Sequence, residues 1–106
     1  MSALVLSLPA HRATPTAAQL VSRVRAMSLE SPRMRFDHPH VQQRFSQRTL
    51  NMRMVLETIR KGNSVGNPYL DQWGDWRIKL RRKVAGRRVQ VVVAVKTDHF
   101  VVVTVI

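Results

Sequence analysis

The most restrictive pattern in this chain is a regular alternation of side chains that begins at residue 76. Apolar and basic residues exchange places at every step, in the order Trp76, Arg77, Ile78, Lys79, Leu80 and Arg81. A period of two is typical of a strand with one buried face. Two almost continuous valine segments follow at residues 88–96 and 99–106, and turn-forming residues at 84–87 and 97–98 join the three segments. We therefore predict a three-stranded antiparallel meander whose middle strand is covered on both faces.

Helical patterns precede this meander. A helix-start signal stands at Thr14, which precedes a proline, and an apolar stripe at helical spacing continues to Met27. A second helix is predicted to open near Asp37. A third has Asn51 as its N-cap and Gly62 as the left-handed residue at its end. The fold class is therefore α+β, with two to three N-terminal helices packed on a three- to four-stranded twisted antiparallel sheet.

Charge divides the chain unevenly. The 106 residues hold 18 Lys and Arg against 6 Asp and Glu, a net charge of +12. Residues 33–106, which we predict to form the α+β domain, hold 15 basic and 5 acidic residues, a net charge of +10. Residues 1–32 are predicted to be a tail with an accessory helix. A domain this basic is expected to bind a polyanion, with RNA first among the candidates.

Several classes of site and location are excluded or disfavoured. The chain has no cysteine, which excludes disulfides, thiolate zinc sites and cysteine nucleophiles. No segment approaches the roughly 18–20 consecutive apolar residues that span a bilayer, and no convincing signal peptide opens the sequence. We expect a cytoplasmic protein with no membrane partner.

The first candidate site is the basic side of the predicted strand at residue 76. Arg77, Lys79 and Arg81 share one face, at a repeat of about 6.8 Å that is close to the phosphate spacing of an extended single strand. The patch is enlarged by four further cations, Arg82, Lys83, Arg87 and Arg88. A solvated strand face usually explains two or three charges. Seven cations among residues 77–88, with no acid, favour contact with a polyanion.

The second candidate site is a row on the predicted second helix. His40, Arg44 and Arg48 recur at intervals of four and would share one helix face. A titratable imidazole beside two guanidinium groups could transfer a proton next to a bound phosphate. The simpler alternative is a row of exposed helix residues. A metal site that combines residues 37–40 with His99 is a weaker hypothesis, and we expect no metal or cofactor.

Together, these segments resemble a bacterial family of domains of unknown function, number four-two-five-eight. The resemblance covers about residues 33–106. It rests on Arg35-Phe36, on His40-x-x-x-Arg44-x-x-x-Arg48-x-Leu50, on the helix that ends at Gly62, on Gly74-x-Trp76 and on the terminal Val102-Val103-Thr104-Val105. Thr49 departs from the pattern, because many relatives have glycine there.

The resemblance implies a fold of the grouping that includes barnase and the RelE/ParE-type toxins. It implies a small toxin-like protein that binds RNA and cleaves it without metal. His40, Arg44, Arg48 and Thr104 would form the catalytic site, and an acidic antitoxin or immunity protein would neutralise it. Two alternatives stay open: a non-catalytic nucleic-acid-binding or protein-interaction module, and a gyrase-directed inhibitor. Fold resemblance alone does not decide whether the chain is an enzyme.

Overall fold

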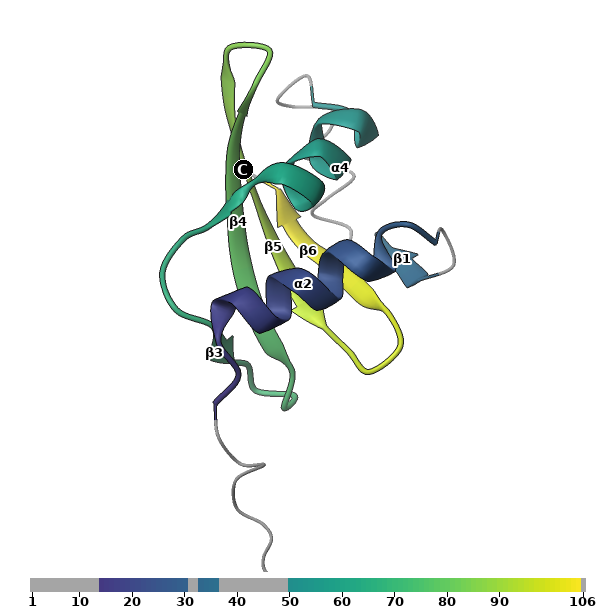
Figure 1. Ribbon diagram of the computed structural model, residues 1–106, viewed down its shortest axis with the longest axis vertical. Coiled ribbons are helices and arrows are strands. Elements are labelled where there is room, and N and C mark those ends of the chain that lie inside the picture. Colours follow the sequence, from purple (N-terminus) through teal and green to yellow (C-terminus); the bar gives the residue numbers. More distant parts are fainter. Residues whose placement is uncertain (1–13, 31–32, 37–49, 106) are drawn as a thin grey trace, which may run out of the picture.

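The computed structural model describes residues 14–30, 33–36 and 50–105. This part of the chain is α+β, as predicted, with helices on one face of a sheet (Figure 1). The elements in chain order are α2 (Ala17–Met27), β1 (Met34–Arg35), α4 (Met52–Lys61), β2 (Asn63–Ser64), β3 (Tyr69–Leu70), β4 (Trp76–Val84), β5 (Arg87–Val95) and β6 (Phe100–Val105).

The predicted meander is confirmed as β4, β5 and β6, which pair antiparallel in sequence order. The β4–β5 turn has positive φ angles at both Ala85 (51°) and Gly86 (78°), which matches the twist of a two-residue hairpin. Three further strands enlarge the described sheet to six. β1 pairs parallel with β6, while β2 and β3 pair antiparallel with β4. Each has only two residues, too few to show a period in the sequence.

Helix α2 begins two residues later than its sequence signal indicates. Thr16, not Thr14, is the N-cap. The Thr16 hydroxyl accepts a hydrogen bond from the Gln19 amide at 3.1 Å, and the Gln19 side chain accepts one from the Thr16 amide at 2.9 Å. This reciprocal capping box satisfies two backbone donors at once, and only Thr16 has glutamine three residues later.

Helix α4 confirms the predicted start and the predicted end, and corrects only the conformation of Gly62. The Asn51 side chain accepts a hydrogen bond from the Met54 amide at 3.0 Å, as an N-cap does. Gly62 follows the helix with φ −74° and ψ 167°, so it is extended and not left-handed. A Cβ at this position would overlap the Thr58 carbonyl oxygen and lie 3.0 Å from that of Arg81. Glycine is therefore required mainly because this residue lies against the last turn of α4 itself, with the backbone of β4 also close by.

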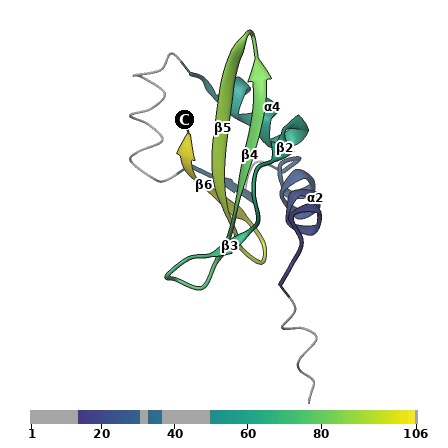
Figure 2. The same ribbon diagram turned by 90° about the vertical axis from the view of Figure 1, so that its left-hand side faces the viewer.

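The core lies between the helices and the sheet. Helices α2 and α4 both cover one sheet face, as Figures 1 and 2 show. They contribute apolar residues such as Leu20, Val24 and Ile59, each at most 1% exposed, to a cluster that includes Ile78 and Leu80 of β4. The inward direction of Ile78 and Leu80 was predicted and is confirmed. Because α2 belongs to this cluster, residues before 33 help to form it; the domain boundary at residue 32 stays a prediction.

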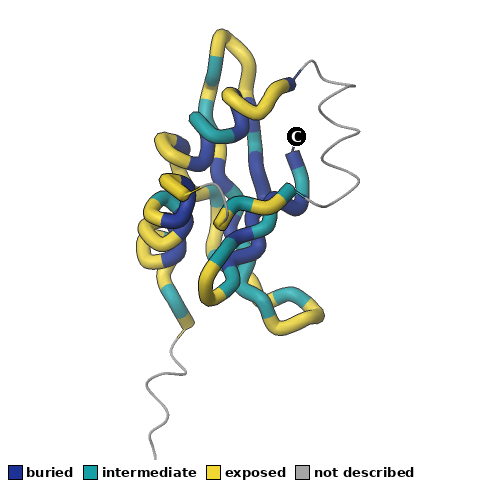
Figure 3. Tube along the Cα trace, turned by 90° about the vertical axis from the view of Figure 1, so that its right-hand side faces the viewer, coloured by how far each residue is buried: buried dark blue, intermediate teal, exposed yellow. Residues whose placement is uncertain are grey.

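The middle strand is buried on both faces. Val89, Val91 and Val93 of β5 are fully buried toward the helices, while Val92 and Ala94 on the other face are 7% and 5% exposed. Figure 3 shows the buried strands between exposed hairpin and helix surfaces. Within the part of the chain that the structure describes, neither helix has the length and apolar character that crossing a bilayer requires.

Candidate functional site

The sheet face turned away from α2 and α4 carries most of the predicted cations; we call it the second face. Its residues on β4 are Arg77, Lys79, Arg81 and Lys83, because the alternate residues Ile78 and Leu80 point into the core. Across from them on β5 stand Ala94, Val92, Gln90 and Arg88 in turn. The prediction that Arg77, Lys79 and Arg81 share one face is confirmed.

The seven predicted cations do not form a single patch. Strand pairing places Arg82 opposite Val89 and Arg87 opposite Val84, on the side of the sheet that faces the helices. Arg82 there donates a hydrogen bond from Nε to Glu57 of α4 at 3.0 Å. The period of two simply continues through the hairpin, so adjacent cations lie on opposite faces. Five of the seven remain on the second face.

Arg77 is not a free cation. Its Nε lies 2.8 Å from Oδ2 of Asp71, whose side chain is only 7% exposed. Its guanidinium carbon lies 5.7 Å from the ring centroid of Trp73, within the range of a cation–π contact. A guanidinium so engaged is held in place by the loop before β4 and has less charge to offer a phosphate.

The remaining cations of the second face have no such partner among the described residues. We call Lys79, Arg81, Lys83 and Arg88 the basic row. Across the ranges 14–30, 33–36 and 50–105, no carboxylate forms an ion pair with any of them. Arg81, Lys83 and Arg88 are exposed and Lys79 is half-buried. Lys83 and Arg88 stand directly opposite each other, which is unfavourable until an anion binds between them.

The basic row ends at the tip of the β4–β5 hairpin. This hairpin projects past α4 at the top of Figure 1. The row therefore runs from the middle of β4 to the protruding tip, where Arg88 of β5 joins it. A ligand that binds along it would have to be elongated and anionic.

Thr104 lies on the same face as the basic row. It is half-buried on β6 and pairs with Val92, which in turn pairs with Lys79. A register shift between Val92 and Val93 adds one residue to β6 at this point. The shift lets Val102 and Val105 both enter the core while Thr104 faces the cations.

His40, Arg44 and Arg48 lie outside the described residues, as do Asp37 and His38. Their acid–base and phosphate-binding roles stay predictions. His99, the remaining histidine of the weaker metal hypothesis, contacts Asp98 at 2.7 Å in the β5–β6 turn. A hydrogen bond from His99 lowers the pKa of Asp98 below its ordinary value. The described residues include no group of three or more His, Asp or Glu side chains placed to hold a metal ion.

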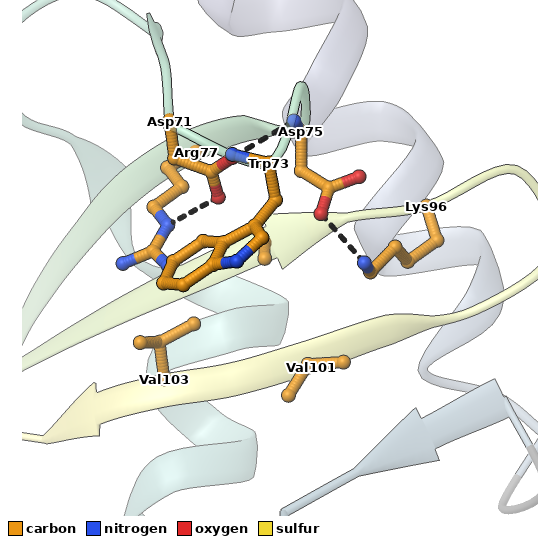
Figure 4. Close-up of a pocket in the computed structure, with 8 residues that line it drawn as sticks. Asp71, Trp73, Asp75, Arg77, Lys96, Val101 and Val103 are labelled. Atoms are coloured by element: carbon orange, nitrogen blue, oxygen red, sulfur yellow. Dashed lines mark hydrogen bonds and ion pairs between the residues drawn. The ribbon is translucent and has the colours of Figure 1, made fainter. Parts of the chain in front are cut away.

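The structure adds a pocket that the sequence did not predict. It holds about 450 Å³ between the loop before β4 and strand β6 (Figure 4). The lining residues are Asp71, Trp73, Asp75, Arg77, Ala94, Lys96, Val101 and Val103. Lys96 Nζ lies 2.6 Å from Asp75 Oδ2. Tryptophan is a residue type on which bases stack, but the position of Trp73 beside Arg77 depends on the loop.

The loop that carries Trp73 is organised around one carboxylate. Oδ1 of Asp71 accepts hydrogen bonds from the amides of Trp73 and Asp75, each at 2.9 Å. The Asp75 amide above all, together with Arg77, holds the pKa of Asp71 below its ordinary value of 3.8. Gly74, at φ +84°, completes the turn. Asp71 is therefore ionised at neutral pH and holds the backbone of the loop at Trp73.

Comparison with known proteins identifies one family. No curated protein and no solved structure matches the chain. The model of one family, described as a domain of unknown function (DUF4258), matches residues 38–106. The match covers more than half of the chain, from the segment before α4 to the end of β6, so this protein belongs to the DUF4258 family.

Proposed function

We propose that this protein binds single-stranded RNA along the second face of its sheet. The observation that carries the proposal is the basic row. Lys79, Arg81 and Lys83 recur at alternate positions of one strand, with no carboxylate partner among the described residues, and Arg88 adds a fourth charge beside them. Cations at a repeat of about 6.8 Å suit the phosphates of an extended single strand.

Electrostatics favours a polyanion over a single small anion. The net charge of +12 attracts any nucleic acid at long range, and this attraction weakens as the salt concentration increases. The row itself spans several strand residues, so it can contact several phosphates at once. An exposed tryptophan next to the row adds a surface on which an unpaired base can stack, which is typical of proteins that bind single strands.

The proposal extends to cleavage of the bound RNA without a metal ion. In this extension, the 2′-hydroxyl of the RNA attacks the adjacent phosphorus and displaces the 5′-oxygen, and His40 transfers the proton from that hydroxyl to the leaving oxygen. Arg44 and Arg48 neutralise the phosphate, and Thr104 supports the site with its hydroxyl. Two observations support it: Thr104 faces the basic row, and the residues matched by the family include His40, Arg44 and Arg48. A cell that makes such a ribonuclease needs an acidic antitoxin or immunity protein to neutralise it.

Binding is tested with a short fluorescently labelled single-stranded RNA and fluorescence anisotropy. The double variant Lys79→Gln, Arg81→Gln should bind more weakly than wild type at low salt. The double variant Arg53→Gln, Lys61→Gln is the matched control, because it also removes two positive charges and both residues are exposed on α4, which covers the other face of the sheet. Equal weakening by both variants would show attraction to total charge and would contradict binding along the second face.

Cleavage is tested by incubating purified protein with total RNA in the presence of EDTA. Wild type should degrade the RNA and His40→Ala should not. Intact RNA with the wild-type protein would contradict the ribonuclease proposal and leave the non-catalytic binding module. If RNA stays intact while DNA supercoiling by gyrase is blocked, the protein is a gyrase-directed inhibitor instead.

A further inference from the structure

The pocket beside Trp73 has an exposed aromatic wall that is held in place. Trp73 is 69% exposed, yet its backbone amide and that of Asp75 are both bound to Asp71. The backbone of the same loop closes on itself, with the Asp71 amide 2.9 Å from the Asp75 carbonyl oxygen. The backbone that presents the indole therefore needs little further ordering when a ligand stacks on it.

The pocket differs from the basic row in charge. Its two carboxylates, Asp71 and Asp75, are paired one to one with Arg77 and Lys96 at 2.8 and 2.6 Å. Two acids and two bases leave the pocket without net charge, so a phosphate gains much less here than on the row. The pocket therefore suits a neutral group that can hydrogen-bond with charged side chains at its rim.

The remaining walls are apolar and belong to the sheet. Ala94 of β5 and Val101 and Val103 of β6 line the pocket on the side of the second face. In Figure 4, Trp73 points from its loop toward β6, with Arg77 beside its ring and the two valines across the pocket from it. A planar group could lie between the indole and these side chains. The volume of about 450 Å³ is within the usual range for small-molecule sites, roughly 300–1,000 Å³.

The pocket and the basic row are continuous along β4. Arg77, which borders the pocket, is the next residue on the second face after Lys79. One step of about 6.8 Å separates them, comparable to the advance of one nucleotide in an extended strand. A strand whose phosphates follow the row from Lys83 to Lys79 would bring its next base to Trp73.

We propose that this pocket binds one unpaired nucleobase, stacked on Trp73, at the end of the strand whose phosphates contact the basic row. This inference rests on the proposed function, because it names what a second part of the same face would recognise. A neutral, planar, polar-edged group matches the aromatic wall, the apolar floor and the balanced charges together.

The experiment uses nucleosides, which carry a base and no phosphate. Adenosine, guanosine, cytidine and uridine are titrated separately into the protein, and the backbone amide signals of Ala94, Val101 and Val103 are followed by NMR. At least one nucleoside should shift these signals saturably. The shifts should persist in the variant Lys79→Gln, Arg81→Gln, persist in Trp73→Phe and disappear in Trp73→Leu.

Affinity for single-stranded RNA gives the second readout. Trp73→Leu should weaken binding by about 5- to 150-fold, the usual effect of losing one stacked base. Leu70→Ala is the control, since Leu70 is 56% exposed but pairs with Trp76 and so lies on the helix side of the sheet; it should leave affinity unchanged.

The outcomes separate the two proposals. If RNA binds through the basic row, but no nucleoside shifts the pocket signals and Trp73→Leu binds RNA like wild type, the nucleobase inference is wrong and the proposed function stands. If a nucleoside binds but the variant Lys79→Gln, Arg81→Gln binds RNA with wild-type affinity, the proposed function is wrong. If peptides with aromatic side chains shift the signals and nucleosides do not, the pocket binds a protein partner and the inference is overturned.

Discussion

Replacement of the whole basic row by glutamine should flatten the salt dependence of RNA binding by a calculable amount. Each phosphate of a single strand that a protein cation neutralises contributes about 0.7 to the slope of log K against log salt. Lys79, Arg81, Lys83 and Arg88 therefore account for a slope of about 2.8. If all seven cations of residues 77–88 contributed, the slope would be about 4.9.

The structure favours the smaller value. Arg77 is paired with Asp71 and Arg82 with Glu57, and Arg87 lies on the helix side of the sheet. The assay is fluorescence anisotropy with labelled single-stranded RNA at several salt concentrations. The quadruple variant should lose about 2.8 from its slope and each single variant about 0.7.

Two results would refute this reasoning. An unchanged slope in the quadruple variant would mean that the row does not contact phosphates. A loss of about 0.7 from the slope in the control Arg53→Gln would mean that the place of a cation on the protein does not affect RNA binding. Thermal unfolding of each variant, followed by circular dichroism, confirms that the affinities compared are those of folded protein.

Two further predictions concern the fold around the site. Gly62→Ala should lower the free energy of unfolding by about 1–3 kcal/mol in urea denaturation, because a Cβ would press on the carbonyl oxygens of Thr58 and Arg81. Unchanged or increased stability, which is the usual result of Gly→Ala at an unstrained site, would contradict this. The lowered pKa of Asp71 predicts that its carboxylate orders the loop at neutral pH and that this stabilisation is lost as pH falls below 3.8. Amide signals of the loop should be constant above that pH in wild type and already altered at neutral pH in Asp71→Asn.

The sheet was largely predictable because its signals are local. A clean period of two at residues 76–81 and the β-branched valine segments after it favour strands, and Asn51 caps α4 as its residue type indicates. The short strands β1, β2 and β3 were not predictable. They exist because a long neighbouring strand offers backbone partners, and two residues carry no period of their own.

The sequence predicted on which face of the sheet the cations of β4 lie, but not which of them form ion pairs. Alternation places Lys79 on the second face, but nothing local indicates that Arg82 meets Glu57, 25 residues away, or that Asp71 holds Arg77. These contacts depend on tertiary structure and decide which cations are available. The roles predicted for His40, Arg44 and Arg48 fall outside the described residues and await the cleavage assay.

Two adjacent residues allow the most direct test of binding along the second face. Arg88 belongs to the basic row, whereas Arg87 points to the helix side, and both are exposed. Arg87→Gln and Arg88→Gln remove the same charge from neighbouring positions in the same hairpin. The affinity of each variant for single-stranded RNA, measured at one low salt concentration, should fall for Arg88→Gln and stay at the wild-type value for Arg87→Gln. An equal loss in both would mean that RNA is attracted by total charge and that the second face is not its binding site.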